Sequence, residues 1–343
     1  MKKVTQTSSR KQDHIRINLE ENVHSGLTTG LENYRFIHQA VPEISLNQVD
    51  LSLSIFGRSL QAPILISSMT GGSEQAFEIN QTLASAAQMT GIAMGLGSQR
   101  AGIENAELAS TFQVRNVAPD ILLFANLGAI QLNYGYGITQ CQRAVDMINA
   151  DALILHFNPL QEAVQPEGDA DFSGLLSKIN KICEALPVPV IAKEVGWGFS
   201  EKAARLLVEA GIAAIDVAGA GGTSWSQVES FRAKDEYQAQ LASVFVDWGI
   251  PTTEAILNVT RAAPGTMIFA SGGLRNGVDI AKSIALGATL GGLASPFLKA
   301  AAQSLEVTQE TINLIKKQIQ VCMFACGAQN LSQLQHNTLE KIG

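Results

Sequence analysis

Short apolar runs recur along the chain, with helix-length amphipathic stretches between them. The runs occupy residues 63–68, 92–97, 121–126, 152–157, 189–194, 213–218, 267–272 and 288–293. They are continuous rather than alternating, which is typical of parallel strands buried on both faces. The stretches 73–89 and 200–210 have helical spacing, and Ser200 and Gly211 are placed to begin and end the second one. The pattern predicts a single (β/α)8 barrel of the α/β class in preference to a doubly wound sheet.

Further segments lie outside this repeat. Residues 49–63 alternate with period two around Gly57 and predict a hairpin that closes the bottom of the barrel. Residues 1–48 contain no candidate barrel strand, so we expect an N-terminal extension followed by a barrel domain over residues 49–343. Residues 219–251, after the sixth strand, are too long for a bare connection and predict a functional loop. The tail after the eighth strand has a helical pattern.

The composition is that of a globular chain with a sizeable core. Of the 343 residues, 46% are hydrophobic and 16% are charged, and the net charge is −7. This balance argues against a nucleic-acid surface but permits local basic pockets for anionic ligands. The basic N-terminus lacks an apolar signal core and no apolar run reaches about 18 residues, so we expect a cytoplasmic protein without a membrane partner. The four cysteines show no metal-binding spacing and are expected to be core thiols.

Polar residues gather at the carboxyl ends of the predicted strands, where (β/α)8 barrels carry their chemistry. The fourth strand ends in HFNPLQE, which contains His156, Asn158, Gln161 and Glu162. The other ends read SSMTGG (67–72), GSQR (97–100), ANLG (125–128), AKE (192–194), AGAGGTSW (218–225), SGGLR (271–275) and ASPF (294–297). Packing alone does not explain such residues at every strand end, so a ligand site is predicted at this rim.

The ends of the last two strands have the features of a phosphate site. Gly272 and Gly273 would let the backbone approach an anion, and Arg275 would add a positive charge. The ASPF segment opens a helix after the eighth strand, which is where such barrels often bind phosphate. An ordinary turn is the alternative explanation for the glycine pair. The segment 219–223, GAGGT, is either a second cradle or a flexible loop.

Lys193 ends an apolar strand, and a buried lysine is costly unless it meets an anion or an acceptor. It either pairs with Glu194 or a strand neighbour, or stands beside an electron-accepting ring or a substrate carbonyl. Asn126 would supply directed hydrogen bonds, and the small residues at 69–72 leave room for a flat ligand. A phosphate clamp on one side and a lysine with amides on the other predict a planar phosphorylated cofactor such as flavin mononucleotide (FMN).

A second basic group lies in RKQDH, residues 10–14. Arg10, Lys11 and His14 would converge with Arg100 on a dense anion such as a diphosphate if the extension folds over a barrel mouth. The alternative is a solvated tail. Glu162 would repel that anion unless Mg²⁺ lies between them, or else it stabilises the first turn of a helix.

The motifs RKQDH, SSMTGG, GLGSQR, HFNPLQE, AKEVGWG, GAGGTSW and SGGLRNGVD occur in this order from residue 10 to about residue 297. In these motifs the chain closely resembles the type 2 isopentenyl-diphosphate delta-isomerases. Asn276 stands where a small hydroxyl residue is expected and should cap the helix equally well, and Phe157 replaces the usual leucine. The resemblance implies isomerisation of isopentenyl diphosphate to dimethylallyl diphosphate by a homo-oligomer, a tetramer or an octamer.

The resemblance also implies the cofactors and the residues that hold them. The cofactors are reduced FMN and Mg²⁺, with NAD(P)H or another reductant supplying electrons without net redox change. FMN would be held by Ser68, Met69, Thr70, Ser98, Asn126, Lys193, Thr223, Gly273, Arg275, Ala294 and Ser295. The substrate would contact Arg10, Lys11, His14, Ser98, Gln99, Arg100, His156, Asn158 and Gln161, and Mg²⁺ would bind Glu162.

Moving a double bond adds a proton at one carbon and removes another from an adjacent position. The intermediate is a tertiary cation, which needs a nearby anion and the exclusion of water. We expect the reduced cofactor itself to supply the acid/base group, with Lys193 stabilising its ring and His156 among the catalytic candidates. Gln161, Trp225 and Glu229 would assist proton movement or shield the cation, although Trp225 would serve equally as plain packing.

Other functions fit the sequence less well. A 2-hydroxy-acid oxidase needs a histidine base, commonly after the seventh strand, and the segment FASGGLR has none. A nucleotide dehydrogenase needs a catalytic cysteine, and none of the four cysteines falls at a strand end. A non-catalytic phosphate-binding barrel would lack a flavin spectrum.

Overall fold

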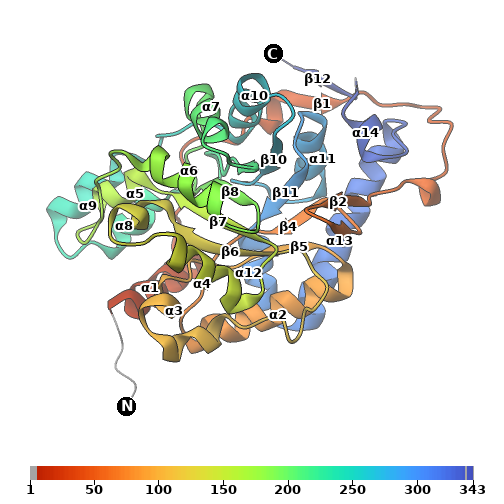
Figure 1. Cartoon of the computed structure of the whole chain (residues 1–343). Coiled ribbons are helices and arrows are strands. Elements are labelled where there is room, and N and C mark those ends of the chain that lie inside the picture. The colour runs from red at the N-terminus through yellow and green to blue at the C-terminus, as the bar shows by residue number, and fades with distance from the viewer. Residues whose placement is uncertain (1–5, 337, 343) are drawn as a thin grey trace.

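The computed structural model of the chain describes residues 6–336 and 338–342, and the side chains among them from residue 13 onward. Eight parallel strands form a closed barrel surrounded by helices (Figure 1). The strands are β4 (Ile64–Ile66), β5 (Ala93–Gly95), β6 (Leu123–Gly128), β7 (Ala152–Phe157), β8 (Val190–Glu194), β9 (Ala214–Asp216), β10 (Met267–Ala270) and β11 (Leu290–Leu293). Pairing of β11 with β4 closes the cylinder. The predicted (β/α)8 barrel is confirmed, and each predicted strand overlaps one of these eight.

Helices surround the barrel, and the two ends that the sequence predicted to be capped are capped in the structure. The helices are α2 (Glu74–Thr90), α3 (Arg100–Glu104), α4 (Ile138–Ile148), α5 (Pro159–Val164), α6 (Leu175–Ala185), α7 (Glu201–Glu209), α10 (Thr252–Ala262), α11 (Gly277–Ala285) and α12 (Ser295–Ala301), with the 3-10 helices η3 (Ala106–Phe112) and η4 (Ala129–Asn133). The Ser200 side chain accepts a hydrogen bond from the Ala203 amide at the start of α7. Gly211 has φ +94° just after it. Asn276 caps α11 in the same way, as expected.

The predicted hairpin is formed by β2 (Leu53–Ile55) and β3 (Arg58–Leu60), which pair antiparallel. Phe56 and Gly57 both have positive φ, +49° and +78°, as a tight two-residue hairpin turn requires. Ile55 and Leu60 belong to the apolar cluster inside the barrel, where the rings of Phe124 and Phe269 stack at 5.8 Å. The hairpin therefore closes the amino-terminal end of the barrel, as predicted.

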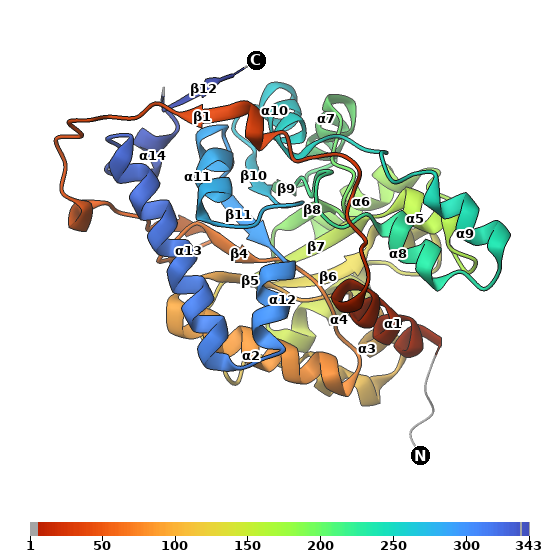
Figure 2. The same ribbon diagram turned by 180° about the vertical axis from the view of Figure 1, so that it is seen from behind.

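The N-terminal extension and the C-terminal tail pair with each other outside the barrel. The extension contains α1 (Gln6–Glu20), the 3-10 helices η1 (Leu31–Asn33) and η2 (Leu46–Gln48), and β1 (Tyr34–Phe36). After α13 (Leu305–Ala325) and α14 (Leu331–Leu334), the tail ends in β12 (Leu339–Lys341), which pairs antiparallel with β1. Figure 2 shows these two strands side by side, and the extension running from them to α1. The helical pattern predicted for the tail is confirmed over α13 and α14, whereas the short strand after them depends on a partner far away in the chain.

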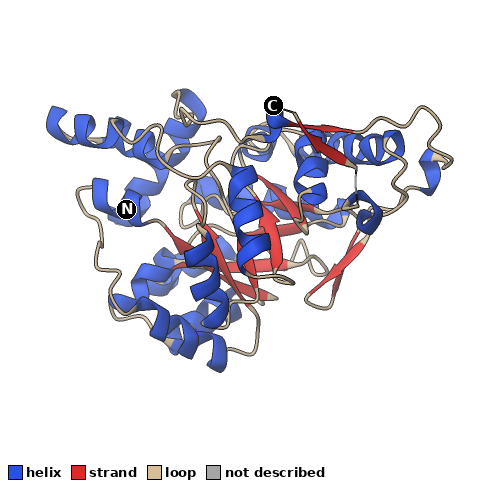
Figure 3. Ribbon diagram, turned by 90° about the horizontal axis from the view of Figure 1, so that it is seen from above, coloured by secondary structure: helices blue, strands red, loops and turns tan. Residues whose placement is uncertain are grey.

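The long segment after β9 is not a bare loop, because it contains two helices. It forms α8 (Trp225–Arg232) and α9 (Glu236–Ser243), and α8 contacts α1, α5 and α9. Figure 3 shows the helices around the strands from above. Within the described residues, the structure has no helix that combines the length and the apolar character needed to cross a membrane. Cys141 and Cys326 are buried, Cys183 and Cys322 are half-buried, and all four are free thiols.

Candidate active site

The interior of the barrel changes from apolar to polar toward the carboxyl ends of its strands. Phe124, Ile154 and Ile191 belong to the apolar cluster that fills the lower part. Above them, His156 on β7, Lys193 on β8 and Asp216 on β9 are consecutive register partners. Because side chains alternate along a strand, three register partners in a row face the same side of the barrel wall. The mouth is therefore lined by titratable groups instead of a further apolar layer.

Lys193 lies in a buried polar network at this mouth. Its Nζ is 3.3 Å from Asp216 Oδ2 and donates to the Glu194 carbonyl at 3.1 Å and to Ser271 Oγ at 3.4 Å. Ser271 Oγ in turn donates to Asp216 Oδ1 at 2.6 Å. The ion pair with a strand neighbour is thus formed, and its partner is Asp216. We did not single out Asp216 or Ser271 in the sequence, although an aspartate inside the apolar run AAIDVA was a visible signal.

Glu194, the other partner considered for Lys193, faces a different environment. Its Oε2 accepts hydrogen bonds from the amides of Val195, Gly196 and Trp197, which follow it in the chain. Burial raises the pKa of Glu194 to about 7, against the lowering effect of these bonds and of Lys193. Its carboxylate organises the loop after β8 instead of contributing to the mouth.

Three hydroxyl groups after β4 lack hydrogen-bond partners among the described residues. They are the side-chain oxygens of Ser67, Ser68 and Thr70, and all three atoms are buried. Buried polar groups are nearly always satisfied, so a cluster of unsatisfied hydroxyls marks a place where a ligand can supply the missing bonds. The segment after β5 packs closely against the same turn, because a Cβ at Gly97 would lie 2.5 Å from the Thr70 backbone. Met69, between the hydroxyl residues, packs against the apolar core.

The glycines after β9 and β10 let two loops and the extension pack backbone against backbone. A Cβ at Gly222 would lie 2.5 Å from the Gly273 amide nitrogen, and one at Gly221 would lie 2.4 Å from the Thr29 nitrogen. Gly272 has φ +99°, and its Cβ would lie 2.1 Å from the Gly219 carbonyl oxygen. Close approach of these segments is a structural reason for both glycine motifs, in addition to the predicted phosphate cradle.

The remaining predicted phosphate and ring contacts lie at the edge of this region. The Arg275 side chain is 75% exposed, and its Nε pairs with Asp279 Oδ2 at 3.1 Å. Ala294 and Ser295 are exposed at the start of α12. Thr223 Oγ1 donates to Asn18 Oδ1 at 3.3 Å, which ties the loop after β9 to α1.

Helix α1 docks on the insert, beside the mouth. His14 Nε2 is 3.2 Å from Glu229 Oε1, and its ring meets that of Trp225 edge-on at 5.0 Å. Gln161 Nε2 donates to the same Glu229 oxygen at 2.8 Å. Ile17 packs with Val23, Val228 and Trp225 beneath this polar contact. Arg10 and Lys11 lie on the same helix, but their side chains fall outside the described ones.

The Glu229 carboxylate is the group with which the other polar side chains of this contact interact. Burial alone would raise the pKa of its carboxyl group, but the hydrogen bond and charge of His14, the charge of Arg232 and the bond from Gln161 lower it to about 2. Arg232 Nη1 also donates to Glu229 Oε2, one turn along α8. The carboxylate therefore stays ionised at neutral pH. Arg232 was not among the residues predicted from the sequence, since its role depends on Glu229 being buried.

Glu162 and Asn158 lie at the start of α5. Glu162 Oε1 accepts from Asn158 Nδ2 at 2.8 Å, and Oε2 accepts from the Gln165 side chain and from the Asp169 amide at 2.7 Å. Asn158 Oδ1 is buried and has no hydrogen-bond partner in the described part of the chain. No group of three or more histidine, cysteine, aspartate or glutamate residues in that part is arranged to hold a metal ion.

Of the predicted site residues on β6 and after β5, some have side chains at the mouth and others have side chains in the barrel wall. Asn126 Oδ1 is 2.8 Å from His156 Nδ1, so these two side chains meet at the mouth. Gln99 is fully buried, and its side chain bonds the Ala144 carbonyl at 2.8 Å and the Asn126 amide at 2.9 Å. The structure thus places the Gln99 side chain between β6 and α4, whereas Ser98 is half-buried and Arg100 opens α3.

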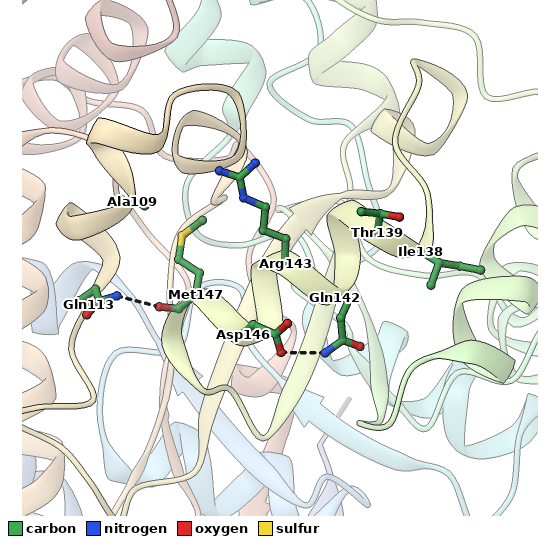
Figure 4. A pocket seen from close by; sticks show the side chains of 8 residues that line it. All are labelled: Ala109, Gln113, Ile138, Thr139, Gln142, Arg143, Asp146 and Met147. Atoms are coloured by element: carbon green, nitrogen blue, oxygen red, sulfur yellow. Dashed lines mark hydrogen bonds between the residues drawn. The ribbon is translucent and has the colours of Figure 1, made fainter.

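A surface hollow of about 690 Å³ lies away from these residues, between η3 and α4 (Figure 4). Gln113 Nε2 donates to the Met147 carbonyl at 3.3 Å, and Gln142 Nε2 donates to Asp146 Oδ1 at 2.8 Å. None of the predicted site residues lines the hollow. It is therefore separate from the candidate site.

Comparison with known proteins identifies similar sequences over almost the whole chain. The family of FMN-dependent dehydrogenases matches residues 156–341. An isopentenyl-diphosphate delta-isomerase of a Nostoc species is 56% identical over 333 residues, covering 97% of this chain and 95% of the relative. The enzyme of the same name from Rickettsia bellii is 51% identical over 326 residues, covering 95% of each.

Solved structures resemble the fold more distantly. A mandelate oxidase variant with a monooxide FMN adduct has a TM-score of 0.67 and 17% sequence identity, covering 98% of this chain and 100% of that one. A second mandelate oxidase, with a bromine-substituted ligand, has a TM-score of 0.69 and 18% identity over 98% of this chain and 99% of that one. At this level of identity the likeness concerns the barrel alone.

Proposed function

The chain belongs to the isopentenyl-diphosphate delta-isomerases, with an FMN-dependent dehydrogenase domain, and we propose that it interconverts isopentenyl diphosphate and dimethylallyl diphosphate using reduced FMN and Mg²⁺. The observation that carries the proposal is the docking of α1: His14 contacts the Gln161–Glu229 pair beside a barrel mouth lined by polar residues. A segment carrying Arg10 and Lys11 is thereby tied to the same mouth. A planar cofactor inside the barrel and a diphosphate under the extension both fit this arrangement.

The residues at the mouth fit FMN. The unsatisfied hydroxyls of Ser67, Ser68 and Thr70 offer hydrogen bonds to a polar ring edge or its phosphate chain. Lys193 provides a buried cation held in place by Asp216. FMN, when bound and reduced, supplies an electron-rich ring with a titratable nitrogen, and we assign the proton exchange to that chemistry. Ser98, Asn126, Thr223, Gly272, Gly273, Arg275, Ala294 and Ser295 complete the proposed FMN contacts.

The residues around α5 fit a diphosphate bridged by Mg²⁺. Mg²⁺ usually keeps several waters and takes one or two carboxylates together with phosphate oxygens. Glu162 supplies one carboxylate, and the unpartnered Asn158 Oδ1 is an acceptor beside it. Arg100 follows β5 and His156 lies on β7, two strands along the barrel, and Arg10 and Lys11 are proposed to complete the diphosphate contacts. The single carboxylate suits a metal that arrives with its substrate.

The protein's own side chains would bind the alkene end and control its protons. Glu229, ionised and buried, offers the negative charge that a tertiary cation requires, and Gln161 links it to the mouth. The Trp225 ring would shield the same cation from water. The bond from His156 Nδ1 to Asn126 Oδ1 places the proton of the neutral imidazole on Nδ1 and fixes the ring orientation.

Anaerobic turnover in deuterated water tests the function. Isopentenyl diphosphate is incubated with the protein, FMN, Mg²⁺ and a reductant such as NAD(P)H, and the product is analysed by mass spectrometry. We expect deuterium-labelled dimethylallyl diphosphate only when the flavin is reduced. A product whose oxidation state differs from that of the substrate would overturn the proposal.

We also propose that the chain forms a homo-oligomer. Tyr237, Val244 and Trp248 are 77%, 72% and 60% exposed, and Leu241 between them is 39% exposed. Their spacing of four, three and four residues puts them on one side of α9 and the turn that follows it. A large exposed apolar stripe of this kind marks a contact surface. Asp235 and Asp247 flank the stripe, and their negative charge suits a second copy of the chain better than an anionic membrane.

A further inference from the structure

Two carboxylates hold Arg100, the residue that the proposed function assigns to the diphosphate. Arg100 Nε donates to Glu104 Oε1 at 2.7 Å, one turn along α3. Arg100 Nη1 donates to Asp169 Oδ2 at 3.3 Å, from the loop after α5. In the described part of the chain Nη2 has no hydrogen bond, and the guanidinium is about one-third exposed. The clamp thus fixes two of the three nitrogens and leaves the third available to an anion.

Asp169 also reaches the proposed metal ligand. Its backbone amide donates to Glu162 Oε2 at 2.7 Å, while its carboxylate accepts from Arg100 and from Gln131 Nε2, the latter at 3.2 Å. The turn that allows this is tight, because a Cβ at Gly168 would lie 1.8 Å from the Glu162 carbonyl oxygen. One residue therefore joins the guanidinium and the carboxylate that would meet the same diphosphate.

We propose that Glu104 and Asp169 are positioning residues that orient Arg100 toward the diphosphate, and that Asp169 fixes the placement of Arg100 relative to Glu162. The inference rests on the proposed function. An arginine side chain is long and flexible, and holding it before the ligand arrives reduces the entropy that binding must overcome. A guanidinium presented in a fixed orientation also matches phosphate oxygens with more than one hydrogen bond.

When these carboxylates are removed, charge and positioning predict opposite changes in the affinity for the diphosphate. Glu104 and Asp169 carry negative charge close to where a diphosphate would bind, so through charge alone their removal would strengthen anion binding. If they act by orienting Arg100, their removal weakens anion binding in spite of the more favourable charge. The direction of the change therefore separates the two effects.

The test is calorimetric titration of the FMN-loaded protein with inorganic pyrophosphate in the presence of Mg²⁺. We expect Asp169→Asn and Glu104→Gln each to weaken binding about tenfold, as loss of an outer partner of a ligand-binding group commonly does. The matched control is Asp171→Asn, two residues along the same loop. The Asp171 carboxylate accepts from the Ser173 amide at 3.0 Å and has no bond to Arg100 or Glu162. The Asp171→Asn variant should bind pyrophosphate with an unchanged or slightly higher affinity.

A double-mutant cycle identifies Arg100 as the route of the effect. In an Arg100→Ala background, Asp169→Asn and Glu104→Gln should cause no further loss of affinity. Unchanged or tighter binding in the single variants, or an undiminished loss without Arg100, would overturn the inference. If circular dichroism shows that Asp169→Asn does not fold, Glu104→Gln, on the exposed side of the clamp, decides the question. Failure of the unsubstituted protein to bind pyrophosphate with Mg²⁺ would instead count against the proposed function.

Discussion

His14 Nε2 lies 3.2 Å from Glu229 Oε1, although 215 positions separate the two residues in the chain. This contact makes the N-terminal extension a part of the mouth of its own barrel. Helix α1 meets α8 there, and α8 carries both Glu229 and Trp225, which faces the His14 ring. The extension and the insert therefore form one unit over the strand ends.

The apolar contact beneath His14 should control this docking. Ile17 is 1% exposed and packs with Val23 and Val228, so Ile17→Ala should cost about 2–5 kcal/mol of local docking energy. We expect faster proteolysis within residues 6–20 and faster amide exchange there, with the barrel helices unchanged. Hydrogen-exchange mass spectrometry measures both regions in one experiment. Leu19→Ala, on the same helix at a side chain 38% exposed, is the control, and equal exchange in the two variants would contradict the prediction.

The Glu229 carboxylate should make the stability of the protein depend on pH in the acidic range. Although burial opposes it, the bonds and charges of His14, Arg232 and Gln161 lower the pKa of Glu229 from 4.5 to about 2. A carboxyl group with a lowered folded-state pKa stabilises the fold fully above its unfolded value, and that contribution is lost as pH falls from about 4.5 toward 2. The contribution is at most about 3 kcal/mol.

The measurement is the melting temperature between about pH 5 and pH 3 for the unsubstituted protein and for Glu229→Gln. The variant starts from a lower stability, because His14 and Arg232 lose their anion, but its melting temperature should fall less steeply with acid. Parallel curves would show that Glu229 is not the group responsible.

The barrel could be predicted because its information is local. Each strand is a continuous apolar run, and the hairpin turn needs a residue such as Gly57 with positive φ. β12 carried no such signal: it is three residues long, two of them charged, and its partner is β1 at the other end of the chain. A strand that depends on a distant partner cannot be recognised from its own pattern.

At the site, the sequence predicted that the functional residues lie at the carboxyl ends of the strands, but it did not predict the direction of every side chain. Residues 98–100 lie after β5, in the turn that leads into α3, where no strand period sets the direction of a side chain. Gln99 enters the barrel wall, and its neighbours Ser98 and Arg100 do not. Arg275 precedes the N-cap of α11 and pairs with Asp279 in the first turn of that helix, a contact that depends on how the chain enters the helix. Asp216 and Arg232 were missed for another reason. Asp216 pairs with Lys193 on the neighbouring strand, and Arg232 pairs with Glu229 on its own helix, whose role follows from its contacts with His14 and Gln161.

Lys193 and Asp216 should depend on each other for stability. Lys193→Ala leaves the Asp216 carboxylate buried without its cation, which should cost about 3–5 kcal/mol. Lys193→Ala combined with Asp216→Asn should recover most of this loss, because the uncompensated charge is gone. Urea unfolding of the two variants and the unsubstituted protein measures both steps. A double variant that is no more stable than Lys193→Ala would contradict a buried pair.

The same variants test the proposed role of Lys193 toward FMN. If Lys193 stabilises the reduced ring, the stable double variant should bind reduced FMN more weakly and with an altered absorption spectrum. An inactive double variant that binds reduced FMN with an unchanged spectrum would contradict this role.

The exposed stripe on α9 should hold the proposed oligomer together. Val244 and Trp248 are 72% and 60% exposed, and replacing both with serine removes apolar area from the stripe, together with the edge contact between the Trp248 and Phe245 rings. Light scattering after size-exclusion chromatography should give a mass well above the 36.5 kDa chain for the unsubstituted protein and a mass closer to the monomer for Val244→Ser/Trp248→Ser. Leu314→Ser, at a leucine 60% exposed on α13, controls for the general effect of removing surface hydrophobics and should keep the larger mass.

Since interface energy is concentrated in a few aromatic anchors, Trp248 should contribute more than Val244 when each is changed alone. Identical masses for the double variant and the control would place the contact surface elsewhere on the barrel.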